Sequence, residues 1–113
     1  MKNKNKKVYI AGKISGLPIA EYTAKFSKAV SHLETLGYEA VNPVEHCNVD
    51  MEWADCVIKC LQLLRECEGI YLLGDWQDSH GAVIEHAFFR KMATQNEDFI
   101  IMKQGEDWNK WAT

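Results

Sequence analysis

The sequence predicts a single α/β domain, a three-layer arrangement in which helices cover both faces of a parallel β-sheet. Short apolar runs alternate along the chain with longer amphipathic segments, and glycine, proline or asparagine follows several of them. This alternation of strand and helix favours a parallel sheet. A length of 113 residues, with 47% hydrophobic and 26% charged side chains, suits one globular core. We therefore expect one domain over residues 1–113, with a disordered lead-in at residues 1–6.

The expected elements follow from apolar spacing and from the residues at their ends. Four short apolar runs predict strands at Val8–Ala11, Tyr38–Val41, Gly69–Leu73 and Asp98–Met102. Three longer segments with helical spacing predict helices at about Ile19–Leu36, Met51–Glu66 and His80–Thr94. Gly37 is expected to end the first helix, and Asp50 and Ser79 are expected to cap the second and third.

The order of the strands places a crevice at one edge of the sheet. Right-handed crossovers leave few topologies, and the flavodoxin-like order 2-1-3-4 is the simplest. Strands 1 and 3 are then neighbours whose connections leave to opposite faces, and ligands usually bind at the carboxyl ends of such strands. The turn at Gly12–Gly16 should therefore face the loop at Gly74–Ser79.

Charge and hydropathy exclude two classes of partner. A formal charge of −3 and a pI near 5.8 leave no broad basic surface, so we expect no polymeric nucleic-acid partner. The lysines among the first seven residues are interpreted as a solvated lead-in. No apolar run approaches the roughly 20 residues that span a bilayer, and Val8–Ala11 is too short for a signal-peptide core. We expect a cytoplasmic protein without a membrane partner.

The four cysteines do not predict a metal site. Cys47, Cys56, Cys60 and Cys67 contain no Cys-x-x-Cys pair, which is the usual signal for zinc. The last three recur at positions that share one face of a helix. We interpret the cysteines as buried thiols and expect neither a metal nor a cofactor.

The segment that follows the third strand carries the most chemistry. Ser79 can cap a helix whose first-turn amides favour an anion, and Gly81 lets a ligand approach the backbone. Helical side chains lean toward the N-terminus, so Glu85 leans toward the same pocket. Glu85 is either a partly desolvated nucleophile or a surface glutamate paired with Arg90 or Lys91.

Three other residues are candidates for the crevice. Tyr9 and Lys13 are the polar-tipped residues near the end of the first strand. Tyr9 either orients a carboxylate through its hydroxyl or belongs to the core. Asp75 is a natural turn residue, and it could also bind a sugar hydroxyl.

Four motifs stand out along the chain: Tyr9-Ile10-Ala11-Gly12, Asn42-Pro43, Cys67-x-Gly69-Ile70-Tyr71-Leu72-Leu73 and Trp76-x-x-Ser79-x-Gly81-Ala82-x-x-Glu85. Together they resemble the nucleoside 2-deoxyribosyltransferase-like superfamily. The resemblance is closest to a compact branch, common in bacteria and phages, that is described mainly as a domain of unknown function. It runs from about residue 7 to residue 102.

The resemblance implies a Rossmann-like, flavodoxin-like sheet and an activity. Enzymes of this superfamily transfer a 2-deoxyribosyl group between bases, or hydrolyse the N-glycosidic bond of deoxynucleoside monophosphates. By resemblance Glu85 is the nucleophile, Tyr9 orients it, and Ser79 and Gly81 hold the 5′ end of the sugar. We expect a small-molecule nucleoside or nucleotide to be bound by six residues: Gly12, Lys13, Asp75, Trp76, Ser79 and Gly81.

One position departs from the pattern of the active enzymes. They carry an Asp, which helps to protonate the leaving base, where this chain has Cys60, and a thiol is a weak donor. Two main functions stay open: an enzyme acting on the N-glycosidic bond, or a non-catalytic nucleotide- or nucleoside-binding module. A small structural or regulatory protein is a third. Relatives of this kind form homo-oligomers, for which Trp108 and Trp111 are candidate contacts, unless they cover the chain's own core.

Overall fold

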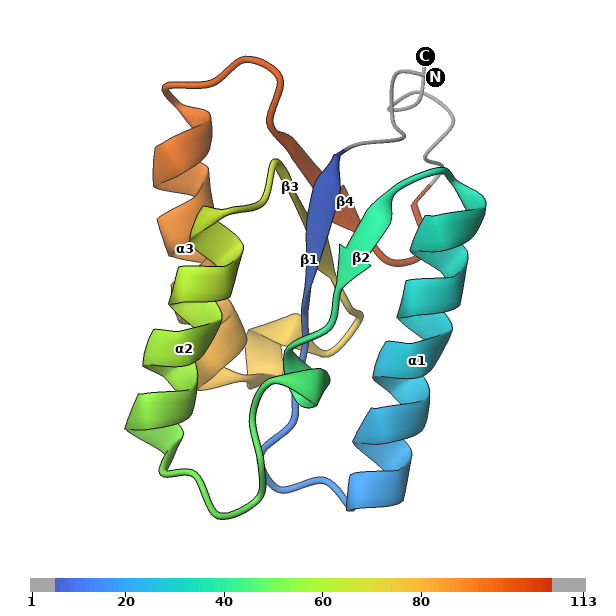
Figure 1. The fold of residues 1–113 in the computed structure, drawn as a ribbon, viewed down its shortest axis with the longest axis vertical. Coiled ribbons are helices and arrows are strands. Elements are labelled where there is room, and N and C mark those ends of the chain that lie inside the picture. Colours follow the sequence, from blue (N-terminus) through green and yellow to red (C-terminus); the bar gives the residue numbers. More distant parts are fainter. Residues whose placement is uncertain (1–5, 107–113) are drawn as a thin grey trace.

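The computed structural model describes residues 6–106, which form a four-stranded parallel sheet between helices (Figure 1). In Figure 1 one helix lies on one side of the sheet and the other two lie together on the opposite side. The elements in chain order are β1 (Lys7–Ala11), α1 (Ile19–Thr35), β2 (Glu39–Val41), η1 (Pro43–Glu45), α2 (Trp53–Arg65), β3 (Gly69–Leu72), η2 (Trp76–Asp78), α3 (His80–Ala93) and β4 (Ile100–Lys103).

The strand order is β2-β1-β3-β4 with every pairing parallel, which confirms the predicted topology. β1 and β3 lie side by side in the middle of the sheet, with Tyr9 opposite Ile70 and Ala11 opposite Leu72. All four residues of β3 are buried, as expected for a strand covered by helices on both faces. The carboxyl ends of β1 and β3 therefore open onto the same edge.

Alternation along the strands divides the core into two layers. Side chains at every second position of β1 and β3 pack toward α1, and those between them pack toward α2 and α3. The layer against α1 contains Val8, Ile10, Phe26, Ala29, Leu33, Tyr38, Tyr71, Leu73 and Met102. The layer against α2 and α3 contains Tyr9, Ala11, Cys60, Leu64, Cys67, Ile70, Leu72, Ala82 and Phe89.

The predicted helix ends are confirmed at two places and wrong at one. Gly37, with φ of 92°, follows the last turn of α1, and the Ser79 hydroxyl accepts a hydrogen bond from the amide of Ala82. Asp50 does not cap α2. The side chain of Asn48 accepts from the amide of Asp50 at 3.0 Å, so the chain is still turning there. α2 therefore begins later, at Trp53.

Two other expectations concern the ends of the chain and the membrane. Trp108 and Trp111 lie outside the described residues, as does most of the lysine-rich lead-in; Lys6, which is described, donates from Nζ to the carbonyl of Asp98 at 2.8 Å. Among the helices of residues 6–106, none is both long enough and apolar enough to cross a bilayer.

Candidate functional site

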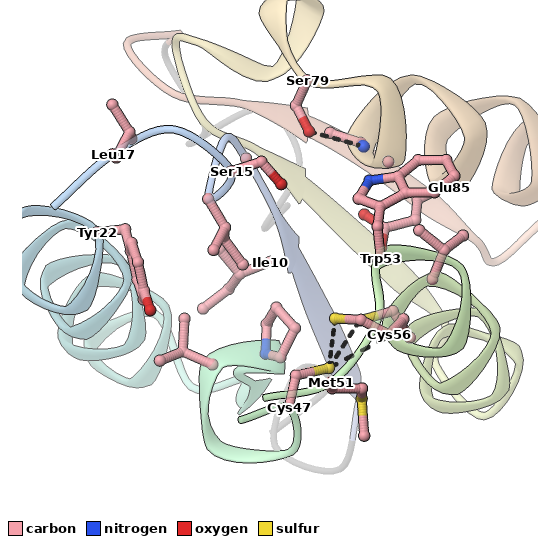
Figure 2. Close-up of a pocket in the computed structure, with 18 of the residues that line it drawn as sticks. Ile10, Ser15, Leu17, Tyr22, Cys47, Met51, Trp53, Cys56, Ser79 and Glu85 are labelled. Atoms are coloured by element: carbon pink, nitrogen blue, oxygen red, sulfur yellow. Dashed lines mark hydrogen bonds between the residues drawn. The ribbon is translucent and has the colours of Figure 1, made fainter. Parts of the chain in front are cut away.

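A cavity of about 660 Å³ lies at the carboxyl ends of the central strands. Its walls come from the β1–α1 loop, the loop after β2, the start of α2 and the start of α3. Figure 2 shows Leu17 and Tyr22 on one side of the cavity and Trp53, Cys56 and Glu85 on the other. This position is the crevice that the strand order predicted.

Tyr9 and Glu85 meet at the inner wall of this cavity. The Tyr9 hydroxyl donates a hydrogen bond of 2.8 Å to Glu85 Oε2. Tyr9 is 0% exposed and Glu85 is 6% exposed, yet both line the cavity. The alternative of a surface glutamate paired with Arg90 or Lys91 is therefore wrong. Both interpretations of Tyr9 hold together, because its ring belongs to the core while its hydroxyl reaches the carboxylate.

Burial dominates the electrostatics of this pair. Burial raises the pKa of Glu85 to about 7, and hydrogen bonds from Tyr9 and Cys60 oppose that rise. Burial, followed by the charge of Glu85, raises the pKa of Tyr9 well above its ordinary range. Tyr9 therefore stays protonated and acts as the donor. A carboxylate with so perturbed a pKa, facing a cavity, is typical of a functional group.

The start of α3 supplies polar groups to the same cavity. Ser79 and Gly81 both line it; Ser79 is the N-cap of α3, and Gly81 lies about one turn before Glu85 on the helix. The amide of Gly81 belongs to the first turn, whose N–H groups have no acceptor within the helix. The helix dipole adds partial positive charge at this end. The arrangement suits an anion or a hydroxyl next to Glu85.

The other four predicted substrate-binding residues divide between the cavity and its surroundings. Gly12 lines the cavity and packs closely on the core, because a Cβ at this position would lie 2.6 Å from Leu73 Cδ1. Lys13, Asp75 and Trp76 lie outside the cavity lining, so their part in binding stays a prediction. Trp76 packs instead against the ring of His86 on α3, and the two ring centroids lie 4.5 Å apart.

Asp75 joins the two loops that flank the crevice. Its Oδ1 accepts from the backbone amide of Lys13 at 3.0 Å, and its Oδ2 pairs with Nζ of Lys25. Lys25 Nζ also donates to the carbonyl of Lys13 at 2.8 Å. Burial alone would raise the pKa of Asp75, but the hydrogen bonds from Lys25 and Lys13 outweigh it and hold that pKa below its ordinary value. Asp75 is thus a structural link between the β1–α1 and β3–α3 loops.

This link predicts a pH-dependent stability difference. Asp75→Asn should lower the free energy of unfolding by about 1 kcal/mol at neutral pH, because the Lys25 ammonium then faces a neutral amide in place of a carboxylate. A depressed folded-state pKa stabilises above the unfolded pKa, so the difference should shrink as the pH falls through the carboxyl range. Urea unfolding from neutral to acid pH measures it. Asp78→Asn, which replaces an exposed carboxylate in the same loop, is the control and should change the free energy of unfolding little. An Asp75 effect that persists undiminished in acid contradicts the interpretation.

Sequence reasoning missed the apolar wall of the cavity. Leu17, Tyr22, Val49, Met51 and Trp53 all line it, and Trp53 is 50% exposed. A signal was present, because three large apolar side chains lie within residues 49–53, two in the polar loop before α2 and one on the first residue of that helix. Apolar side chains in a loop at the ligand-binding edge of a parallel sheet indicate a binding wall.

The cysteines are partly as predicted. Cys60 and Cys67 are buried, whereas Cys47 and Cys56 are half-buried and line the cavity together with Cys60. Burial raises the pKa of Cys56 to about 11 and raises that of Cys60 further. Cys60, at the position where the resemblance implies an acid, adjoins both Tyr9 and Glu85.

Comparison with known proteins matches residues 6–96 to one family, described as a domain of unknown function (DUF4406). No curated protein matches the chain.

Proposed function

The chain belongs to the DUF4406 family of domains of unknown function, and within it we propose an enzyme that acts on the N-glycosidic bond of a (deoxy)nucleoside or its 5′-monophosphate. One observation carries the proposal: Glu85, buried and hydrogen-bonded by Tyr9 at 2.8 Å, faces a cavity of about 660 Å³. The resemblance in the motifs around Tyr9 and Glu85 supports the choice of substrate class.

The proposed reaction proceeds in two displacements. The ionised carboxylate of Glu85 attacks the anomeric carbon, and the electron pair of the C–N bond leaves with the base. A glycosyl ester on Glu85 results. Water then attacks the same carbon, the ester C–O bond breaks, and Glu85 regains its charge. One proton of that water is finally carried by the released base. An acceptor base in place of water turns hydrolysis into transfer.

The chain's own residues position this chemistry. The Tyr9 hydroxyl holds Glu85 Oε2 and so fixes the orientation of the carboxylate. The first turn of α3, at Ser79 and Gly81, suits the 5′ hydroxyl or phosphate. Tyr22 and Trp53 lie on the opposite walls and offer aromatic faces to a base. A volume of about 660 Å³ is within the range of small-molecule sites.

A non-catalytic binding module is the second candidate, and Cys60 favours it. A buried thiol whose pKa is raised donates a proton poorly to a leaving base. The same cavity and the same start of α3 would still bind a nucleoside or nucleotide. The two candidates differ only in whether product forms.

Incubation of the full chain with a panel of substrates separates the candidates. The panel contains deoxynucleosides, ribonucleosides and their 5′-monophosphates, each with and without a second free base, and chromatography measures base release or exchange. Release or exchange from at least one member supports the enzyme. Saturable binding by calorimetry with no product on any member rejects catalysis and leaves the binding module. Neither binding nor product would reject both.

Gly81 provides a prediction that separates binding from folding. A Cβ at Gly81 would lie 3.6 Å from Val57 Cγ2 and 3.9 Å from Ser79 Oγ, which are ordinary contacts inside the cavity. Gly81→Ala should therefore keep or slightly raise the melting temperature, since alanine favours a helix by up to about 1 kcal/mol. The added methyl should weaken ligand binding about tenfold or more, equivalent to about 1.4 kcal/mol. Thermal unfolding and calorimetry measure the two effects. Unchanged ligand affinity in Gly81→Ala, with the melting temperature retained, would contradict this role for Gly81.

A further inference from the structure

Three cysteine sulfurs meet in the wall of the cavity, and the proposed reaction does not use them as a group. Cys47 Sγ lies 2.6 Å from Cys56 Sγ and 3.7 Å from Cys60 Sγ. All three sulfurs lie within 4.8 Å of one another. Figure 2 shows Cys47 and Cys56 pointing toward each other from the loop after η1 and from α2.

The local structure explains why these sulfurs converge. Cys56 and Cys60 are four residues apart on α2, so they share one face of the helix. The same i, i+4 spacing on a helix is used for paired metal ligands. Cys47 comes from the other side, where its amide donates to the carbonyl of Pro43 at 3.2 Å and closes the η1 turn. One helix and one anchored loop thus provide three thiols without a Cys-x-x-Cys pair.

We propose that Cys47, Cys56 and Cys60 form a binding site for a thiophilic divalent cation of the zinc type, with a fourth coordination position open to the cavity. Thiolate sulfur is a preferred ligand of zinc, whereas calcium and magnesium require oxygen. All three cysteines line the cavity, so water or a cavity ligand can complete a tetrahedral site.

The geometry needs only a small adjustment. Zinc–sulfur bonds of about 2.3 Å in a tetrahedron place the sulfurs about 3.8 Å apart. The Cys47–Cys60 separation of 3.7 Å already corresponds to that value. The Cys47–Cys56 pair at 2.6 Å must open by about 1.2 Å, the difference between 3.8 and 2.6 Å. Both side chains of this pair are half-buried and border open cavity space, so they have room to rotate.

The chemical balance is that of metal binding to thiols. One divalent cation takes three thiolates and releases three protons to the buffer. No sulfur is oxidised. A disulfide between Cys47 and Cys56, in contrast, would oxidise two sulfurs and require an oxidant. A disulfide would also leave unexplained why the third sulfur, on Cys60, lies within the same cluster. The proposed site does not depend on the proposed glycosidic activity.

Zinc titration of the full-length, metal-free and fully reduced protein tests the site. Competition with a chromophoric chelator should give one zinc per chain, and cobalt substitution should give the thiolate charge-transfer and tetrahedral ligand-field bands. Cys47→Ser and Cys56→Ser should each weaken zinc binding by more than the roughly 10- to 100-fold that loss of an outer-shell partner causes. Cys67→Ser is the matched control. Cys67 is buried, and its thiol faces the carbonyl of Leu63 at 3.4 Å, away from the cluster.

Several results would overturn the proposal. These are the absence of stoichiometric zinc binding by the reduced protein, zinc affinity unchanged in both Cys47→Ser and Cys56→Ser, or equal loss in Cys67→Ser. A Cys47–Cys56 disulfide that persists in thiol reductant and excludes zinc would also overturn it. Cys47 and Cys56 are only half-buried, so their serine variants should fold, and circular dichroism verifies this.

Discussion

Replacing Glu85 with glutamine should lower the rate of base release by at least about three orders of magnitude on any substrate that the protein turns over. The glutamine side chain keeps the shape of the carboxylate. Its neutral amide, however, does not attack the anomeric carbon. The amide oxygen can still accept the hydrogen bond from Tyr9, so the buried position should remain satisfied. Initial rates of base release, measured by chromatography at saturating substrate, provide the comparison.

The control for this variant is a carboxylate far from the cavity. Glu97→Gln changes the same functional group at an exposed position after α3 and should leave the rate unchanged. In the wild type, mass spectrometry of a quenched reaction should detect a sugar adduct on the peptide that contains Glu85, and Glu85→Gln should lack it. A Glu85→Gln rate close to that of the wild type, with folding intact, would rule out Glu85 as the nucleophile.

Truncation of Phe89 should cause a large loss of stability, about 3–5 kcal/mol for Phe89→Ala. Phe89 is 0% exposed and packs between α3 and the sheet in the layer against α2 and α3. Its ring stacks on Phe99 with a centroid distance of 5.4 Å and an interplanar angle of 18°. Alanine would leave a cavity between α3 and the sheet. Urea unfolding followed by circular dichroism measures the change in free energy.

The neighbouring phenylalanine provides the matched control. Phe88 precedes Phe89 on α3 but is 36% exposed. Phe88→Ala should therefore cost clearly less than Phe89→Ala, since more than a third of Phe88 is already exposed to solvent. Equal losses in the two variants would show that the face assigned to α3 is wrong.

The architecture of this protein was determined by local features of its sequence. Short apolar strands such as Val8–Ala11 alternate with amphipathic helices, and right-handed crossovers leave few strand orders, of which the simplest is the one observed. The cap at Ser79 was predictable for the same reason, because the residues that mark the start of a helix are neighbours in the sequence. Asp50 shows the limit of prediction from local sequence. The side chain of Asn48 holds the amide of Asp50 in a turn, and α2 begins only after that turn.

Which side chains contact one another at the candidate site was decided by the tertiary structure. The sequence suggests Glu85 as either a nucleophile or a surface side chain, and only its burial and the 2.8 Å bond from Tyr9, 76 residues away, settle its environment. Asp75 likewise acquired a role as a link through Lys25, a contact that no spacing predicts.

The cysteines show the same division most clearly. Periodicity predicts that Cys56 and Cys60 share a face of α2, because that depends on helical geometry alone. The position of Cys47 depends on how the loop after β2 crosses the edge of the sheet, and the loop itself carries no periodic signal. The sequence by itself therefore determined the fold and the edge at which a site forms. Which side chains meet there depends on contacts between distant segments, which only the packed chain provides.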